Sequence, residues 1–170
     1  MTDNTKAKER YTEAMGFFVA ENYDEAIRLL GDAIAEDETF TLALVSRGAA
    51  HMRSNRTGEA IADFNRALDI DDGNAKAFHL RGLAHEQHGD DAAAESDFNR
   101  AIELDPEYGA AYFSRATLHT KTGQEDQALE DMQMVAHLTD RNIAEFANDN
   151  NVWRSQHLRV EAALESELNR

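Results

Sequence analysis

The chain repeats itself at intervals of 34 residues, and this period constrains its fold more than any other feature of the sequence. Four consecutive stretches, residues 7–40, 41–74, 75–108 and 109–142, align without a gap. The eighth residue of each stretch is small and the twenty-fourth is large and apolar: Ala14, Gly48, Gly82 and Ala116, against Leu30, Phe64, Phe98 and Met132. Small side chains let two helix backbones approach closely, and a large one fills the space beside them. The period therefore predicts two antiparallel helices in each stretch.

This pattern resembles that of the tetratricopeptide repeat (TPR) family, whose helix pairs recur at the same interval. The third stretch agrees best with the family pattern, through Phe78, Gly82, Ala94, Phe98, Ala101 and Pro106. The resemblance covers residues 7–142 and implies an all-α fold, a right-handed α-α superhelix (TPR solenoid) of four helix pairs. The first stretch departs most, because Arg10 and Glu13 stand where apolar residues are usual. A polar first unit suits the exposed end of an array.

Residues 143–170 do not continue the repeat. The run Asn148-Asp149-Asn150-Asn151 interrupts the apolar pattern, and an apolar stripe at helical spacing follows it: Trp153, His157, Val160, Leu164 and Leu168. Such a stripe predicts an amphipathic helix. We expect this helix to cap the open end of the fourth stretch, since repeat arrays need terminal caps. The alternative is a dimerisation or partner-binding helix anchored by Trp153.

Three stretches carry an arginine at position 7 together with an aspartate at position 23, whereas the first stretch lacks both. The resulting pairs are Arg47 with Asp63, Arg81 with Asp97, and Arg115 with Asp131. Because the two residues are present or absent together, we predict an ion pair between the two helices of each stretch, with a structural role. Pairing with the following stretch would leave Asp131 without an arginine.

The same three stretches have a histidine at position 11, where the family usually has tyrosine: His51, His85 and His119. Equivalent positions on neighbouring helix pairs lie on the order of 10 Å apart, given usual helix spacings. Zinc ligands must lie at about 2 Å from the metal, so a shared site is disfavoured. We expect these imidazoles to pack and hydrogen-bond in place of tyrosine, and a His-dependent metal-binding sensor is a remote alternative.

The net charge of −16 argues against nucleic acids and anionic membranes as partners, and it favours an apolar or basic protein. The chain has no cysteine, which excludes disulfides and thiolate zinc sites. No secretory signal or membrane-spanning stretch is recognisable, so we expect a cytoplasmic protein.

Common nucleophile, phosphate-loop and zinc-protease motifs are missing from the sequence. We therefore expect no catalytic activity and no cofactor.

In the TPR family the first helix of each repeat lines a concave surface. Transferred position by position, the resemblance implies a binding groove formed by Tyr11, Met15, Phe18, Val45, Ala49, Met52, His79, Leu83, Phe113 and Thr117. An apolar strip of this kind suits an extended peptide or a helix of a partner protein. Some family members clamp C-terminal carboxylates with lysine and asparagine side chains. That clamp is not expected here, because Lys76 alone matches its pattern.

Together these features predict a protein–protein interaction module, an adaptor or scaffold that binds a peptide or helix in its concave groove. One alternative is a small secretion-type TPR chaperone. Another is a self-assembling scaffold, in which the C-terminal helix docks into a neighbouring copy and forms homo-oligomers.

Overall fold

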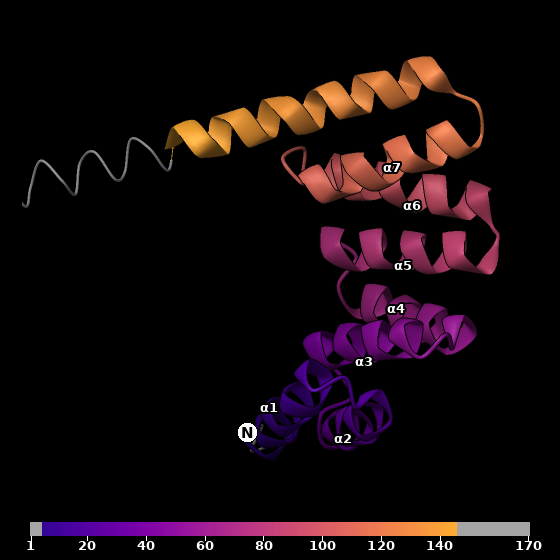
Figure 1. Ribbon diagram of the computed structural model, residues 1–170. Coiled ribbons are helices and arrows are strands. Elements are labelled where there is room, and N and C mark those ends of the chain that lie inside the picture. Colours follow the sequence, from indigo (N-terminus) through magenta and orange to yellow (C-terminus); the bar gives the residue numbers. More distant parts are fainter. Residues whose placement is uncertain (1–4, 146–170) are drawn as a thin grey trace, which may run out of the picture.

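The computed structural model describes residues 5–145, which form a stack of antiparallel helix pairs and contain no strand (Figure 1). The helices are α1 (Thr5–Val19), α2 (Tyr23–Glu36), α3 (Thr41–Arg53), α4 (Thr57–Ile70), α5 (Ala75–His88), α6 (Asp91–Leu104) and α7 (Gly109–Lys121), and residues 125–145 are also helical. Each 34-residue stretch thus supplies a first helix (A helix: α1, α3, α5, α7) and a second helix (B helix: α2, α4, α6, residues 125–145). The fold is an all-α helical-repeat superhelix, as the sequence predicts.

Every A helix within residues 5–145 is followed by a left-handed residue at position 15 of its repeat. Gly89 and Gly123 adopt this conformation with φ of 91° and 79°, and Glu21 and Asn55 do so with φ of 58° and 60°. Glycine adopts positive φ without a steric penalty, whereas Glu21 does so at some cost. In the first and third repeats the next helix then begins at a side-chain cap: Asn22 accepts a hydrogen bond from the backbone N–H of Glu25 at 3.4 Å, and Asp90 accepts one from that of Ala93 at 3.1 Å.

In the second and third repeats, the two helices meet where a phenyl ring of the B helix lies on a glycine of the A helix. A Cβ atom placed on Gly48 would lie 2.6 Å from Phe64, and one on Gly82 would lie 2.6 Å from Phe98. Both rings are completely buried. Glycine at position 8 therefore sets how closely the two helices approach, and the ring fills the remaining space.

Neighbouring repeats pack so that each helix contacts the next along the chain, and the A helices also contact one another from α3 to α5 and from α5 to α7. Figure 1 shows the resulting progression, from α1 and α2 at one end of the array to the helix over residues 125–145 at the other. No helix within residues 5–145 is long and apolar enough to cross a membrane.

The three predicted Arg–Asp pairs are present, and each is a fork between the A and B helices of one repeat. Arg81 donates from Nε and Nη2 to the Asp97 carboxylate at 2.8 and 2.6 Å, and its Nη1 donates to Asn65 of the preceding repeat at 2.7 Å. Arg115 repeats the arrangement with Asp131 and Asn99. The guanidinium thus joins two helices of its own repeat to the repeat before it, a link that the sequence pattern did not reveal.

Arg47 completes the fork with Asp63 but has a glycine, Gly31, at the position that Asn65 and Asn99 occupy in later repeats. A Cβ atom on Gly31 would lie 3.6 Å from Nη1 of Arg47. The junction between the first and second repeats therefore lacks the arginine–asparagine hydrogen bond that the next two junctions between repeats contain.

The B helix of the fourth repeat runs to residue 145, past position 30 of the repeat, where α2, α4 and α6 end. In the earlier repeats an aspartate at position 31 follows the helix, and its carboxylate accepts a backbone N–H two residues on: Asp37, Asp71 and Asp105. Thr139 holds this position in the fourth repeat, and neither glycine nor proline follows nearby. The boundary predicted after Asn142 therefore falls inside a helix. The stripe from Trp153 to Leu168 lies outside the described residues.

Alanine at Gly82 should destabilise the protein by about 1–3 kcal/mol, because its methyl group overlaps the Phe98 ring. Gly16 is the matched control, since its added Cβ meets nothing within 4 Å. Gly16→Ala should stabilise the protein by about 0.5–1 kcal/mol through helix propensity. Urea unfolding of both variants checks the opposite signs, and equal effects at the two sites would contradict the packing account.

Asparagine at Gly31 should complete the first junction by accepting a hydrogen bond from Arg47. Gly31→Asn should therefore stabilise the protein by about 1 kcal/mol more than Gly16→Asn, which changes helix propensity alone. Thermal unfolding of the two variants measures this difference. Equal stabilities would show that the amide at this position does not couple the repeats.

Candidate functional site

A hollow of about 190 Å³ lies across three A helices, α1, α3 and α5. It is lined by Tyr11, Met15, Phe18, Leu42, Val45, Ser46, Ala49, Lys76 and Leu80. Most of these side chains are apolar, and they come from three consecutive repeats. The hollow exists because stacking brings the same face of successive A helices together.

Five of the ten residues implied by the family resemblance line this hollow: Tyr11, Met15, Phe18, Val45 and Ala49. Val45 is only 6% exposed, so it forms the floor of the hollow and not its rim. The other five lie outside it.

Met52 and Leu83 are partly buried against core clusters, so they serve packing more than binding. Phe113 is 55% exposed on α7, and Thr117 is exposed one turn further along the same helix. His79 is buried and does not line the hollow.

Four lining residues are absent from the ten predicted groove residues: Leu42, Ser46, Lys76 and Leu80. Leu42 and Lys76 occupy position 2 of their repeats, and Ser46 and Leu80 occupy position 6. Each residue of a helix is rotated by about 100° from the last, so position 6 shares a face with positions 2 and 9. The helical spacing of positions 2, 6 and 9 would therefore have identified Ser46 and Leu80 as groove residues.

Aromatic and hydroxyl groups connect successive repeats beside the hollow. The Tyr11 hydroxyl lies 3.3 Å from Ser46 Oγ, and its ring lies 5.3 Å from the Phe40 ring. These contacts fix the rotamer of Tyr11, because both its ring and its hydroxyl have partners. The wall of the hollow is therefore formed before any ligand binds.

His79 occupies the place of Tyr11 two repeats later and makes the same kind of contact. Its Nε2 lies 2.9 Å from Ser114 Oγ, its Nδ1 lies 3.1 Å from the Tyr108 hydroxyl, and the His79 and Tyr108 rings stand edge to face. Burial lowers the pKa of His79 to about 4. The imidazole is therefore neutral near neutral pH and joins the third repeat to the fourth.

Positions 2, 5, 9, 12 and 13 of each repeat, the concave positions of the family, carry more positive than negative charge here, although the whole chain has a net charge of −16. The cationic residues there are Lys8, Arg53, Lys76 and Lys121, and Glu86 is the anionic one. Lys121 binds Asp91 at 2.6 Å, and Arg53 donates to the Tyr23 hydroxyl. Within residues 5–145, no carboxylate lies within ion-pair distance of Lys8 or Lys76. Among the residues that the structure describes, Lys76 therefore presents an ammonium group without an ion-pair partner at the hollow.

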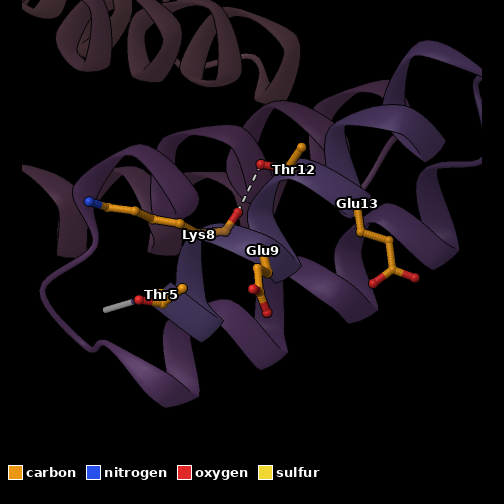
Figure 2. Close-up of a pocket in the computed structure, with 5 residues that line it drawn as sticks. All are labelled: Thr5, Lys8, Glu9, Thr12 and Glu13. Atoms are coloured by element: carbon orange, nitrogen blue, oxygen red, sulfur yellow. Dashed lines mark hydrogen bonds between the residues drawn. The ribbon is translucent and has the colours of Figure 1, made fainter. Parts of the chain in front are cut away.

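A second depression lies on the exposed side of α1 (Figure 2). Its lining residues are Thr5, Lys8, Glu9, Thr12 and Glu13, all from one helix. Figure 2 shows Lys8 and Glu13 pointing in different directions, and the hydrogen bond from Thr12 goes to the Lys8 carbonyl group. Side chains from a single helix that do not converge provide no enclosed site.

The three position-11 histidines each lie beside the aspartate of their own repeat and do not converge on one another. His51, His85 and His119 place Nε2 at 3.8, 3.9 and 3.8 Å from Asp63, Asp97 and Asp131. Burial lowers the pKa of His51, and the nearby Asp63 carboxylate opposes this shift. Among the residues from 5 to 145, no group of three potential metal ligands gathers.

Three models described as tetratricopeptide repeat match the chain, over residues 11–75, 75–108 and 98–130. Together the matches extend from residue 11 to residue 130. No curated protein matches the sequence.

Solved structures of repeat proteins share the fold. MamA is 19% identical, with a TM-score of 0.76 over 84% of this chain and 83% of MamA. The first TPR of Spaghetti (RPAP3), bound to the HSP90 peptide SRMEEVD, is 24% identical, with a TM-score of 0.69 over 72% of this chain and 97% of that one. The second TPR domain of human RPAP3, in complex with the HSP70 peptide SGPTIEEVD, is 27% identical, with a TM-score of 0.65 over 67% and 95%.

Stability should fall as the pH drops, because the folded state holds His79 neutral. Its pKa lies near 4 in the folded protein and near its ordinary value of 6.5 in the unfolded chain. The stabilisation is complete above the unfolded pKa and is lost as the pH falls toward the folded one. The unfolding free energy should decrease on the order of 1–2 kcal/mol between about pH 7.5 and about pH 5.

Urea unfolding across this pH range measures the effect, with His79→Gln as the control that cannot titrate. The control should lose less stability on acidification than the wild type does. A wild-type stability that does not change over this range would contradict the burial of a neutral imidazole.

Proposed function

The chain belongs to the tetratricopeptide repeat family, and on this premise we propose that it is an adaptor or scaffold that binds an apolar segment of a partner protein in its concave hollow. The observation that carries the proposal is the meeting of apolar side chains from α1, α3 and α5 around one hollow. We also propose that the chain has no catalytic activity of its own, because its sequence lacks the common catalytic motifs.

Exposed apolar surface at the hollow supplies the driving force for binding. Leu42 is 51% exposed although it lines the hollow. Covering the exposed half of such a side chain contributes about 1 kcal/mol, and Met15 and Phe18 add partly exposed surface beside it. A ligand with two or three apolar side chains in an extended or helical segment fits this strip.

The charge of the hollow favours acidic side chains beside the apolar ones. The net charge of the whole chain predicts an apolar or basic partner, but interactions between exposed charges more than about 8 Å apart are largely screened at physiological salt. A bound segment therefore responds mainly to the nearest groups, and Lys76 is the charged side chain among the described residues that line the hollow. We propose that the partner segment is apolar with at least one carboxylate.

The similar structures support a peptide as ligand. Two RPAP3 domains are bound to peptides that contain the sequence Glu-Glu-Val-Asp, in which acidic residues flank an apolar one. The lysine–asparagine clamp pattern is missing from this chain apart from Lys76. We therefore expect Lys76 to pair with a side-chain carboxylate within the segment, and not with a chain terminus.

Leu42→Glu should abolish binding of the groove-dependent partners, since it places a carboxylate on the apolar strip. Ile70→Glu is the matched control, because Ile70 is similarly exposed, at 42%, at the end of α4 and away from the hollow. Affinity capture from native lysate with wild type and both variants, followed by mass spectrometry, compares the bound proteins. The account predicts proteins that Leu42→Glu loses and Ile70→Glu retains, and identical sets for all three would refute a concave site.

The charge of the partner is tested on the proteins that this comparison identifies. Lys76→Met keeps most of the side-chain length and removes the charge. Binding should weaken about two- to fivefold, as expected for one partly exposed ion pair, and should also weaken with added salt. Tighter binding by Lys76→Met would indicate a basic partner.

A further inference from the structure

The second residues of the repeats lie in a row across the concave side, near the ends at which the A helices begin. Lys8, Leu42, Lys76 and Ala110 occupy this position, and all four are exposed. Each lies one helical turn before the position-5 residue of its own helix, as Lys8 does before Tyr11. The first three side chains alternate between a cation, an apolar group and a cation. We call Lys8, Leu42 and Lys76 the position-2 row.

The two lysines of the row have no charged partner within residues 5–145, whose ion pairs leave both ammonium groups without a carboxylate. Figure 2 shows the Lys8 side chain extending away from Glu9 and Glu13 of its own helix. In the described part of the chain, both charges of the row are therefore available to carboxylates of a ligand.

The stacking of the repeats sets the distance between neighbours in the row. The Tyr11 hydroxyl lies 3.3 Å from Ser46 Oγ of the next A helix, and α3 contacts α5 in turn. The axes of helices in contact are about 8–10 Å apart. Equivalent positions on neighbouring A helices therefore have about the same spacing, so that Lys8 and Lys76 are about 16–20 Å apart, with Leu42 between them.

We propose that the hollow selects an extended segment in which two acidic residues lie six positions apart and an apolar residue lies midway between them. The proposal rests on the proposed function, because it concerns the same hollow. A polyproline II helix has three residues per turn and rises about 3.1 Å per residue, so every third side chain lies on one side at intervals of about 9.3 Å. Side chains i, i+3 and i+6 therefore match Lys8, Leu42 and Lys76 in spacing and in chemistry.

Other regular conformations fit the row less well. In a β-strand successive side chains point to opposite sides, so residues i and i+3 do not face the same surface. An α-helix with its side chains is about 10–12 Å across. The hollow beside the row has a volume of about 190 Å³, which accommodates side chains and not a helix of that width.

The middle position of the segment supplies the apolar contact. Leu42 is 51% exposed, and an apolar side chain placed against it removes surface of both groups from water. An acidic side chain at the middle position would lose this contact. The fourth position-2 residue, Ala110, offers neither a charge nor a large apolar group, so the selected pattern ends at Lys76.

Two peptides of the same composition test the spacing by calorimetric titration of the full-length protein. The first, acetyl-Glu-Pro-Ala-Leu-Pro-Ala-Glu-amide, has its glutamates six positions apart and its leucine midway. The second, acetyl-Glu-Pro-Leu-Ala-Glu-Pro-Ala-amide, has its glutamates four positions apart. The first should bind about fivefold more tightly or better, because the second engages one lysine at a time.

Lysine variants assign each carboxylate of the first peptide. Lys8→Met and Lys76→Met should each weaken its binding about two- to fivefold, and the effects should multiply in the double variant because the two sites are far apart. Lys6→Met is the matched control, since Lys6 lines a separate depression with Glu36, and it should leave binding unchanged. Replacing one glutamate of the peptide by glutamine should remove the effect of one lysine variant and preserve that of the other.

The spacing is overturned if the two peptides bind equally well, if the first does not bind, or if Lys8→Met binds it as tightly as the wild type does. These results differ from a failure of the proposed function. That failure would appear in the affinity capture, as partners that Leu42→Glu retains, whereas a wrong spacing alone leaves the loss of those partners as predicted.

Discussion

The structure depends on one close contact, that of a B-helix phenyl ring with an A-helix glycine. In the second and third repeats no side chain larger than hydrogen fits at Gly48 or Gly82 without moving the ring. The contact fixes the distance between the paired helices of these two repeats, and Ala14 with Leu30 and Ala116 with Met132 keep the same small–large pairing in the first and fourth. Equivalent pairs stack with the same face of each A helix on one side, and the hollow follows from that stacking.

Polar groups then fix the order of the pairs along the array. Each buried aspartate at position 23 accepts both hydrogen bonds of an arginine fork, and the remaining guanidinium nitrogen of Arg81 and Arg115 reaches the preceding repeat. A buried carboxylate without such a partner would be strongly destabilising, so pairs of this kind favour one arrangement of the helices. Many of the remaining acidic residues lie at turns and on exposed helix faces, which leaves the concave positions with the positive charge of Lys8 and Lys76.

The period of 34 residues predicted the helix pairs and the Arg–Asp contacts, because both depend on positions that recur in phase. It did not predict the Asn65–Arg81 link, since asparagine occurs at that position in only two repeats. The burial of His79 was missed because it depends on Tyr108, at the far end of its own repeat, and on Ser114 of the next repeat. The long helix over residues 125–145 was also missed, although the replacement of a turn-forming aspartate by Thr139 was visible in the sequence.

The central claim is that the concave side of the A helices holds a polypeptide segment of another protein. A photo-crosslinking amino acid placed at Ala49, which lines the hollow, tests it in native lysate. The same amino acid at Ala62, exposed on α4, is the comparison. The account predicts discrete crosslinked partners at position 49 that are not formed at position 62. Crosslinks at position 62 alone, or the same products from both positions, would contradict it.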